Sequence, residues 1–392
     1  MINRRQALTA ALGGAWAAHR PLLGATKPVI ASMEIFQVKV NHRGNWVIVR
    51  LKTDTGVTGL GEASHGLGDA VTIQLIEQLF ASLKGRSAFD VEWLHAHADP
   101  LIQRQKNSTA ASAVSGLEQA MWDIQGKVLG VPCYQLFGGA LRRDIRHYAN
   151  INRCTVERTP AGFRASAKRA VADGFDAIKL APFDGIPKPG AAGFQAGVDN
   201  GVACIEAVRE VLGAKGDLLV DGHDRFDVPS GLELVKRMIP LNLYWLEEVT
   251  PPPGLPEIDR AAPMKTAGGE LLYGMPAFRQ YLQAGSVDII MPDVKYCGGM
   301  LELKKSAAVA EAFGVPVSPH GPASPIGNAA AAHVCASMPN FLILELGYGE
   351  VDWRSSLVTP PERFERGVMK LTDKPGLGIE LNDAVAAAHR VA

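Results

Sequence analysis

The feature of this sequence that most constrains its fold is a series of eight short apolar runs, which alternate with amphipathic segments after residue 140. The intervening segments, such as 161–173, 198–212, 230–238 and 301–313, carry apolar residues at helical spacing. Eight strands alternating with helices predict a TIM-like barrel, which is an α/β fold. The predicted strands are residues 147–151, 177–180, 218–221, 243–247, 265–270, 288–293, 315–320 and 341–345.

Ionisable residues end seven of these eight runs. From the third run onward they recur at intervals of 23 to 27 residues, which is about one β/α unit of a barrel of roughly 200 to 250 residues. The loops that follow parallel barrel strands form one open face, so the spacing predicts that these groups gather at one mouth. The residues are Lys179, Asp221, Glu247, Glu270, Asp293, His320 and Glu345, and His223 follows Asp221 by two positions.

The chain before the barrel has a different pattern. Residues 32–40 and 45–53 alternate apolar and polar side chains and predict a small antiparallel sheet, and helical spacing follows over 70–83, 91–104 and 110–129. We therefore expect an α+β capping domain over residues 29–142 and the barrel over 143–365. Residues 366–392 are expected to pack back toward the cap.

Adjacent arginines at positions 4 and 5 precede a short run rich in Ala and Leu. This segment, residues 1–28, resembles a twin-arginine export signal, which predicts export to the periplasm. The alternative is a plain N-terminus of a cytoplasmic protein.

The balance of charges argues against two classes of binding partner, nucleic acids and anionic lipids. Forty basic side chains face forty acidic ones, so no overall field attracts nucleic acid or anionic lipid. No window holds the roughly 18 consecutive apolar residues of a spanning helix. We expect neither a nucleic-acid partner nor a membrane span.

Three of the strand-end residues, Asp221, Glu247 and Glu270, are carboxylates on neighbouring strands. They would repel one another at neutral pH unless a cation lay between them. Oxygen ligands without cysteine suit Mg²⁺ or Mn²⁺, so the sequence predicts one divalent metal ion at this position. The alternative is that they are ordinary carboxylates paired with Lys or Arg.

On the next two strands, Asp293 and His320 can form a dyad. The aspartate accepts a hydrogen bond from one imidazole nitrogen and leaves the other free to take a proton. His320 is therefore the predicted general base. A histidine satisfied by hydrogen bonding in the core is the alternative.

Several motifs together resemble the enolase superfamily, in particular its mandelate racemase-like branch. The resemblance spans nearly everything after residue 30. The motifs are Gly59-Leu60-Gly61-Glu62, the segment Gly116-Leu117-Glu118-Gln119-Ala120-Met121-Trp122-Asp123-Ile124-Gln125-Gly126-Lys127, Trp245-Leu246-Glu247-Glu248 and Gly268-Gly269-Glu270.

This resemblance implies a (β/α)₇β barrel under a cap, bound Mg²⁺, homo-oligomers, and removal of a proton next to a substrate carboxylate to give an enolate. It also carries a finer implication. Acid-sugar dehydratases similar to galactonate dehydratase have a histidine two residues after the first metal ligand, which protonates the departing hydroxyl. His223 stands at that position.

The chemistry of the strand ends agrees with elimination. A racemase needs a base on each face of the carbon, and the second lysine usual in the family would fall at Ala181, which cannot accept a proton. Elimination needs one base, His320, and one acid, His223. Lys179 would bind the substrate carboxylate with the metal, and Glu345 would hydrogen-bond the enolate edge.

Two departures from the family pattern affect the site. Val249 replaces the usual proline after the paired glutamates, so Glu248 competes with Glu247 as a ligand; alternation along the strand favours Glu247. Residues 182–197, rich in Gly and Pro, are expected to line or shield the pocket. The predicted substrate-binding residues are Asn150, Asn152, Arg225, His42, Trp46 and His65.

The sequence thus predicts a Mg²⁺-dependent dehydratase of a sugar acid, an aldonate or aldarate, that yields a 2-keto-3-deoxy acid. Three alternatives remain open. One is an epimerase, racemase or cycloisomerase of the same superfamily. Another is a glycosidase that uses Glu247 and Glu270, and the third is a non-catalytic exported protein that binds sugar acids.

Overall fold

A parallel sheet curled into a barrel forms the larger part of the computed structural model, which describes residues 27–64, 66–105 and 108–391. Seven strands lie in the order β10-β4-β5-β6-β7-β8-β9. Val317 bridges Ile290 of β9 and Phe341, just before β10, and so closes the ring in the predicted seventh position. The strands are β4 (Asp144–Asn150), β5 (Ala177–Leu180), β6 (Asp217–Asp221), β7 (Trp245–Glu247), β8 (Lys265–Gly268), β9 (Ile289–Ile290) and β10 (Leu344–Gly347).

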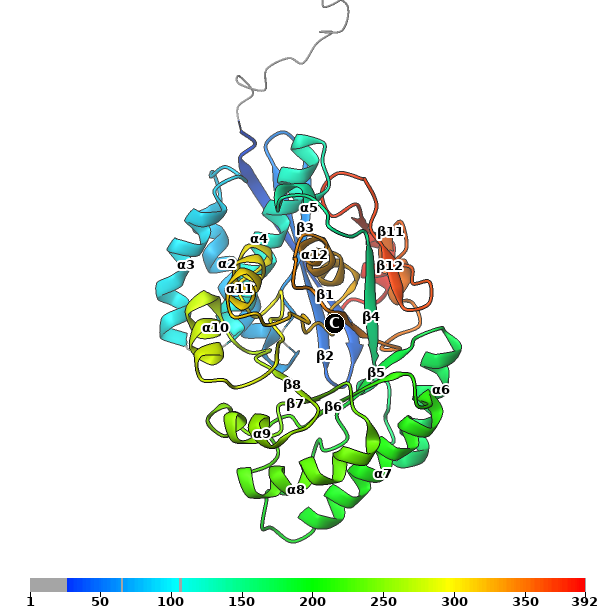
Figure 1. Cartoon of the computed structure of the whole chain (residues 1–392). Helices are drawn as coiled ribbons and strands as arrows, with labels where there is room; N and C mark the ends of the chain where they lie inside the picture. The colour runs from blue at the N-terminus through cyan, green and yellow to red at the C-terminus, as the bar shows by residue number, and fades with distance from the viewer. Residues whose placement is uncertain (1–26, 65, 106–107, 392) are drawn as a thin grey trace, which may run out of the picture.

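Seven helices connect these eight positions within residues 144–347, a stretch described without a gap, and this confirms the predicted barrel. Helices α6 to α9 cover the outside of strands β5 to β8 (Figure 1). The helices are α6 (Pro160–Ala172), α7 (Phe194–Leu212), α8 (Val228–Met238), α9 (Leu255–Ala261), α10 (Gly274–Gln283), α11 (Met300–Ala312) and α12 (Pro325–Ala336), with short 3₁₀ turns at η2 (Ile239–Leu241) and η3 (Pro252–Gly254).

Local sequence signals begin three of these helices. Thr159, Asp227 and Ser324 each accept a hydrogen bond from a backbone N–H in the first turn of α6, α8 and α12. A proline occupies the first or second position of each helix. A backbone N–H at these positions would have no acceptor within the helix, so proline costs no hydrogen bond there. These caps fix where each strand-to-helix loop ends.

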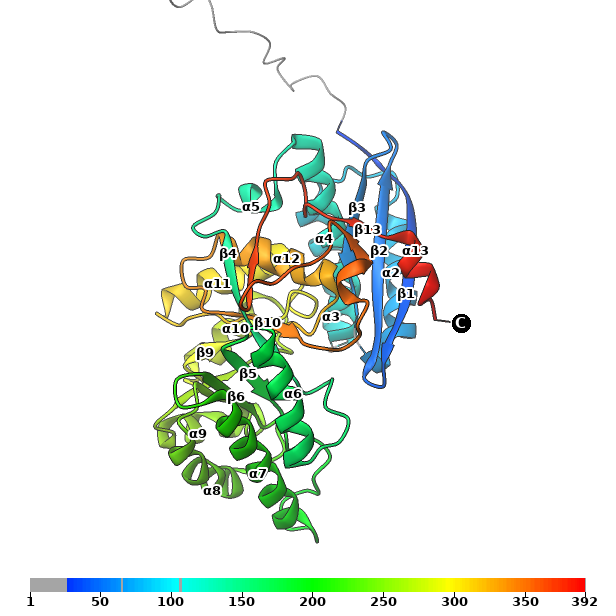
Figure 2. The same ribbon diagram turned by 90° about the vertical axis from the view of Figure 1, so that its right-hand side faces the viewer.

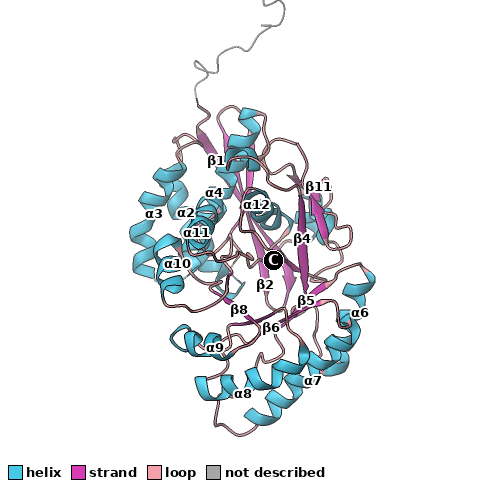
Figure 3. Cartoon of the chain, in the orientation of Figure 1, coloured by secondary structure: helices cyan, strands magenta, loops and turns pink. Residues whose placement is uncertain are grey.

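The cap consists of an antiparallel sheet backed by helices, as expected (Figure 3). Its glycines allow close packing, because a Cβ atom at Gly61 would lie 2.0 Å from the Gly116 carbonyl oxygen of α4. The elements are β1 (Ile30–Asn41), β2 (Gly44–Thr53), β3 (Thr58–Glu62), η1 (Gly66–Gly68), α2 (Asp69–Leu83), α3 (Val91–Gln105) and α4 (Ser108–Leu129), followed by α5 (Cys133–Leu136).

Two buried carboxylates of the cap fasten it to the barrel. Glu62 Oε2 accepts hydrogen bonds from the Ser324 and Gly327 amides at the start of α12, at 2.8 and 3.0 Å. Glu118 accepts from the amides of Met300 and Leu301 at the start of α11, at 2.8 and 2.9 Å. Each acid satisfies free N–H groups of a barrel helix, which explains two glutamates in the sequence motifs of the cap.

The C-terminal segment returns along the cap. The last helix lies beside β1 (Figure 2), where the Lys39 amide donates to the His389 carbonyl oxygen at 2.7 Å. Asp123 of α4 accepts from the Leu377 amide at 2.7 Å. The segment holds η4 (Arg354–Leu357), β11 (Val358–Thr359), β12 (Val368–Lys370), β13 (Glu380–Leu381) and α13 (Asp383–Ala388).

Residues 1–26 lie outside the described residues, so the export signal predicted over residues 1–28 falls almost wholly there. Among the helices of the described residues, none has both the length and the apolar composition needed to cross a bilayer.

Candidate active site

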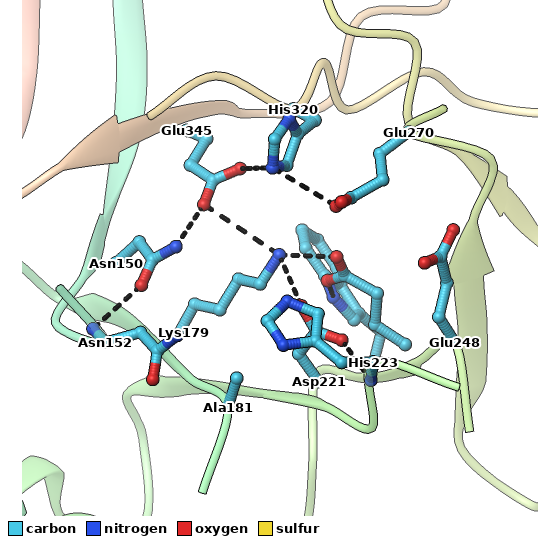
Figure 4. Close-up of polar contacts among 12 residues, drawn as sticks. Asn150, Asn152, Lys179, Ala181, Asp221, His223, Glu248, Glu270, His320 and Glu345 are labelled. Carbon is cyan, nitrogen blue, oxygen red and sulfur yellow. Dashed lines mark hydrogen bonds and ion pairs between the residues drawn. The ribbon is translucent and has the colours of Figure 1, made fainter. Parts of the chain in front are cut away.

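Five of the strand-end residues face one another at the mouth of the barrel in Figure 4: Lys179, Asp221, Glu270, His320 and Glu345. The other two join them through contacts, Glu247 with Lys179 and Asp293 with His320. Lys179 lies on β5, Asp221 and Glu247 end β6 and β7 as register partners, and Glu345 lies on β10. The other three residues lie two or three positions beyond the strand or bridge of their barrel position: Glu270 after β8, Asp293 after β9 and His320 after the bridge at Val317. The even spacing in the sequence therefore corresponds to one residue per barrel position.

The carboxylates of Asp221, Glu247 and Glu270 form the acidic cluster. One oxygen of each lies within 4.8 Å of the others, and the first two side chains are fully buried. Asp221 Oδ2 and Glu270 Oε2 accept no hydrogen bond among the described residues, although cationic groups approach them. Buried carboxylate oxygens without hydrogen bonds, at this separation, fit the oxygen donors that a hard divalent cation requires.

Burial and charge act differently on the members of the cluster. Burial raises the pKa of Glu247 well above its usual value, and the neighbouring Asp221 raises it further. Burial alone would also raise the pKa of Asp221, but His223 and Lys179 hold it below its usual range. The cluster thus carries strong electrostatic repulsion that a cation would relieve.

Lys179 is the central cation of the site. Its Nζ lies 3.0 Å from Asp221 Oδ2 and 3.8 Å from Glu345 Oε1, and it donates a hydrogen bond to Glu247 Oε1. Burial would lower the pKa of this ammonium, yet the three carboxylates raise it well above its usual value. Lys179 is therefore a fixed positive charge rather than a proton acceptor.

His320 pairs with Asp293 as predicted from their order in the sequence. Its Nδ1 lies 2.6 Å from Asp293 Oδ2, and its Nε2 lies 3.1 Å from Glu270 Oε2 and 3.8 Å from Glu345 Oε2. Burial would raise the pKa of Asp293, but Lys295 and His320 lower it to about 2. The aspartate is thus an ionised acceptor that fixes the ring and directs Nε2 into the site.

His223 has a similar arrangement on the opposite side. Its Nδ1 lies 2.6 Å from Asp184 Oδ1, and its Nε2 lies 2.9 Å from Asp221 Oδ2. Burial alone would lower the pKa of His223, but these two aspartates raise it well above its usual value. Nδ1 is hydrogen-bonded to Asp184 and Nε2 forms an ion pair with Asp221, so the ring is held between two carboxylates as a cation that can give a proton.

The two predicted asparagines contact carboxylates of the site. Asn150 donates from its amide to Glu345 Oε1, and its Oδ1 accepts from the Asn152 backbone amide at 2.9 Å. Asn152 Nδ2 donates to Asp184 Oδ2 at 3.1 Å. Both side chains therefore orient acidic groups, and their predicted contact with substrate hydroxyls stays a prediction.

The predicted cap residues lie in different surroundings. His42 is exposed on the turn between β1 and β2, whereas Trp46 is buried in β2 and packs edge-on against Trp353 with ring centroids 5.6 Å apart. Trp46 also lines a small cavity at the junction of cap and barrel. Arg225 is exposed on the loop after β6, and His65 lies outside the described residues.

Sequence reasoning missed three charged residues of the site. Asp184 lies in the loop after β5, and no periodic pattern marks it. Lys295 is buried two residues after Asp293, binds that carboxylate at 2.8 Å, and lines the small cavity with Arg153. A lysine so near a strand-end aspartate is a signal that the sequence did contain.

Glu248, the rival ligand, does not belong to the acidic cluster. Its Oε1 accepts a hydrogen bond from the Gly269 amide at 2.8 Å. Burial, together with the charges of Glu270 and Asp221, raises its pKa to about 8. Glu248 comes directly after β7 with φ +37°, and its carboxylate binds the Gly269 amide, so Glu247 is the glutamate that belongs to the cluster.

Comparisons with known proteins match both the cap and the barrel. A model of the mandelate racemase / muconate lactonizing enzyme N-terminal domain matches residues 26–138, and one described as enolase C-terminal domain-like matches residues 162–385. D-xylonate dehydratase of Haloferax volcanii is 34% identical over 363 residues, which cover 88% of this chain and 85% of that protein. D-galactarolactone cycloisomerase of Agrobacterium fabrum is 31% identical, and the match covers 86% of this chain and 89% of that protein.

A solved structure is similar over nearly the whole chain. The mandelate racemase/muconate lactonizing enzyme-like protein of Rubrobacter xylanophilus superposes with a TM-score of 0.87 at 34% identity. The match covers 94% of this chain and 98% of that one.

Proposed function

The chain belongs to the mandelate racemase-like branch of the enolase superfamily, and on this premise we propose that it is a Mg²⁺-dependent dehydratase of sugar acids. The reaction removes water across C2 and C3 of an aldonate or aldarate and yields a 2-keto-3-deoxy acid. One observation carries the proposal: two imidazoles, each hydrogen-bonded to an aspartate, flank one cluster of carboxylates. Elimination needs one base and one acid, and this arrangement supplies both.

Asp221, Glu247 and Glu270 are the residues that would hold a single Mg²⁺, or Mn²⁺ in its place. The two carboxylate oxygens that accept no hydrogen bond support this assignment. When bound, the ion supplies Lewis-acid stabilisation of the negative charge that develops on the substrate carboxylate. Lys179 adds a buried positive charge on the same side, and its position between carboxylates keeps it protonated.

His320 is the proposed base for the C2 proton. Its Nδ1 is held by Asp293, so Nε2 is the atom that accepts the proton. Glu345 lies beside this nitrogen and accepts hydrogen bonds from Asn150 and the Gly321 amide. Burial alone would raise the pKa of Glu345, but Lys179 and His320 hold it below its usual value, so Glu345 is an ionised acceptor and its predicted hydrogen bond to the enolate edge stays a prediction.

His223 is the proposed acid for the 3-hydroxyl. The proton passes from its Nε2 to the hydroxyl oxygen as the C3–O bond breaks, and water leaves because hydroxide is a poor leaving group. The resulting enol tautomerises to the 2-keto acid, so atoms and electrons balance without an external oxidant. Ala181, at the position of a second base, offers no proton-accepting group, which favours elimination over racemisation.

A screen of aldonic and aldaric acids with added Mg²⁺ tests the proposal. We expect keto-acid formation from at least one sugar acid, loss of activity in EDTA, and recovery with Mg²⁺ or Mn²⁺. Glu247→Gln is expected to lose activity even with excess metal. Turnover in EDTA at the full rate, or tight binding of sugar acids without any turnover, would contradict the proposal.

A second candidate comes from the cycloisomerase among the relatives. Such an enzyme would act on a sugar-acid lactone, and its product would keep all atoms of the substrate. The mass of the product distinguishes the two reactions, because dehydration removes one water from the sugar acid, whereas isomerisation leaves the mass of the substrate unchanged.

A further inference from the structure

The loop after β5 contributes a carboxylate to the imidazole of His223. Asp184 Oδ1 lies 2.6 Å from Nδ1 of the ring, and no other side chain among the described residues hydrogen-bonds that nitrogen. The backbone of His223 has φ +44°, a conformation that costs energy for a residue with a side chain. Asp184 at Nδ1 and Asp221 at Nε2 are the groups that orient the ring, and Asp184 is the one of the two that lies outside the acidic cluster.

Asp184 is itself held at its second oxygen. Its Oδ2 accepts from Arg43 Nη2 at 2.5 Å, from Asn152 Nδ2 at 3.1 Å and from Arg158 Nη2 at 3.4 Å. Three donors on one oxygen leave the other oxygen for His223. The side chain is only 10% exposed, so these contacts form in surroundings with little water, where they are strong.

One of these donors comes from the cap. Arg43 lies on the turn between β1 and β2, where its backbone amide donates to Asn41 Oδ1 at 2.8 Å. Its guanidinium reaches across to the barrel loop and forms the ion pair with Asp184. The cap hairpin is thus linked to His223 through a single intervening carboxylate.

Among the described residues, no hydrogen bond or ion pair links the other histidine to the cap hairpin, although Lys295, which binds its aspartate, lines the small cavity beside Trp46. Asp293, which holds His320, is bound by Lys295 through Nζ at 2.8 Å and through the backbone amide at 2.6 Å. Lys295 belongs to the barrel loop that also carries Asp293. Disturbing the cap hairpin is therefore expected to affect one histidine and spare the other.

We propose that Asp184 is a positioning residue for His223, and that Arg43 of the cap hairpin holds Asp184 in place, so that elimination depends on the cap while proton removal at C2 does not. This inference rests on the proposed dehydratase function. It assigns roles to two residues that neither touch the metal cluster nor take part in the proton transfers.

The test measures the two half-reactions separately. Keto-acid formation reports elimination, and deuterium uptake at C2 of the remaining sugar acid in D₂O reports proton removal by His320. Asp184→Asn is expected to lower elimination by about 10²-fold, since a misplaced catalytic group costs about that much, with C2 exchange within about twofold of the wild type. Arg43→Gln removes one of three donors and is expected to lower elimination by about 10-fold.

Asp199→Asn is the matched control. Asp199 is an exposed aspartate of α7 that pairs with Arg237 at 2.7 Å, so its loss is expected to change neither half-reaction. Thermal unfolding of each variant checks the fold. Arg43 is a half-buried residue of the cap hairpin that lies outside the barrel core. Arg43→Gln therefore provides the test if Asp184→Asn does not fold.

The outcomes separate the inference from the function. Normal elimination by both variants, while His223→Asn has lost it, would overturn the inference and leave the function standing. Equal loss of exchange and elimination would also overturn it, because Asp184 would then support the site as a whole. Absence of both half-reactions in the wild type with every sugar acid would overturn both proposals.

Discussion

The two sides of the barrel mouth carry the same chemical unit built in two different ways. In both His320 and His223, Nδ1 lies 2.6 Å from an aspartate oxygen. Nε2 lies 3.1 Å from a carboxylate of the acidic cluster in His320 and 2.9 Å from one in His223. They belong to the seventh and third barrel positions, which are opposite each other in an eight-membered ring. The substrate would therefore lie between two imidazoles held in similar ways.

The supports of these imidazoles differ. The His320 side chain is 8% exposed, and its aspartate and lysine partners both come from one short stretch of the barrel. The His223 side chain is 28% exposed, and its aspartate comes from a neighbouring loop that is bound in turn by the cap. The base is thus built into the rigid barrel, whereas the acid is assembled across the boundary between barrel and cap.

The largest expected effect comes from removing the base. His320→Asn leaves no group at this position that can take up the C2 proton, so both C2 exchange and elimination are expected to fall by about 10⁴-fold. Deuterium uptake and keto-acid formation measure the two rates on one sample. Retained exchange in this variant would show that another residue removes the proton, and the comparison between the two sides would fail.

Removing the acid is expected to separate the two rates. His223→Asn leaves His320 and its partners intact, so C2 exchange is expected to continue while elimination falls by about 10³-fold. The measurement is again the ratio of deuterium uptake to keto-acid formation. If both rates fell together, the two histidines would act as one unit rather than as separate acid and base.

Two histidines elsewhere sharpen the comparison, because they are more deeply buried than His320 and His223 and have neutral hydrogen-bond partners. Burial lowers the pKa of His147 and of His333 to about 4, and the carbonyl oxygens that they contact compensate only in part. Below pH 6.5 these imidazoles take up protons in the unfolded chain, whereas in the folded protein they stay neutral until the pH approaches 4. Stability is therefore present above the unfolded pKa and is lost as the pH falls toward 4.

For His333 the loss is about 2 kcal/mol in the free energy of unfolding between pH 7.5 and pH 5. Urea unfolding of the wild type and of His333→Gln at the two pH values measures it as a difference of differences. The advantage of the wild type over the variant is expected to shrink by this amount at pH 5. An advantage that grows on acidification would mean that His333 is cationic in the folded protein.

The sequence was most informative where the fold repeats. Asp221, Glu247, Glu270, Asp293 and His320 follow one another at the pitch of a β/α unit, and a repeat of that kind specifies a common face without any knowledge of the loops. The barrel and the convergence of these side chains could be predicted for that reason, whereas the cap followed from strand alternation and helical spacing.

The supports of the site could not be predicted in the same way. Asp184 lies in a loop rich in Gly and Pro, and its partners Arg43 and His223 are 141 and 39 positions away in the chain. Contacts of this kind depend on the path of a loop over the surface, which follows no period. Asn150 was assigned to the substrate on its position alone, yet its amide binds Glu345, because strand-end amides satisfy buried carboxylates as readily as ligands do.

The smallest effect is expected on the support of the base. Lys295→Met removes the ammonium that binds Asp293 Oδ2, but the Lys295 backbone amide still donates to Oδ1 at 2.6 Å and keeps the carboxylate in place. We expect exchange and elimination to fall together by about 10-fold, since proton removal precedes elimination and the buried aspartate is left with less compensation for its charge. Kinetics in H₂O and D₂O measure both rates, with Lys304→Met on the outer helix α11 as the control. A loss of elimination alone would place Lys295 with the acid instead, and the division of the mouth into a barrel-built base and a cap-linked acid would then be wrong.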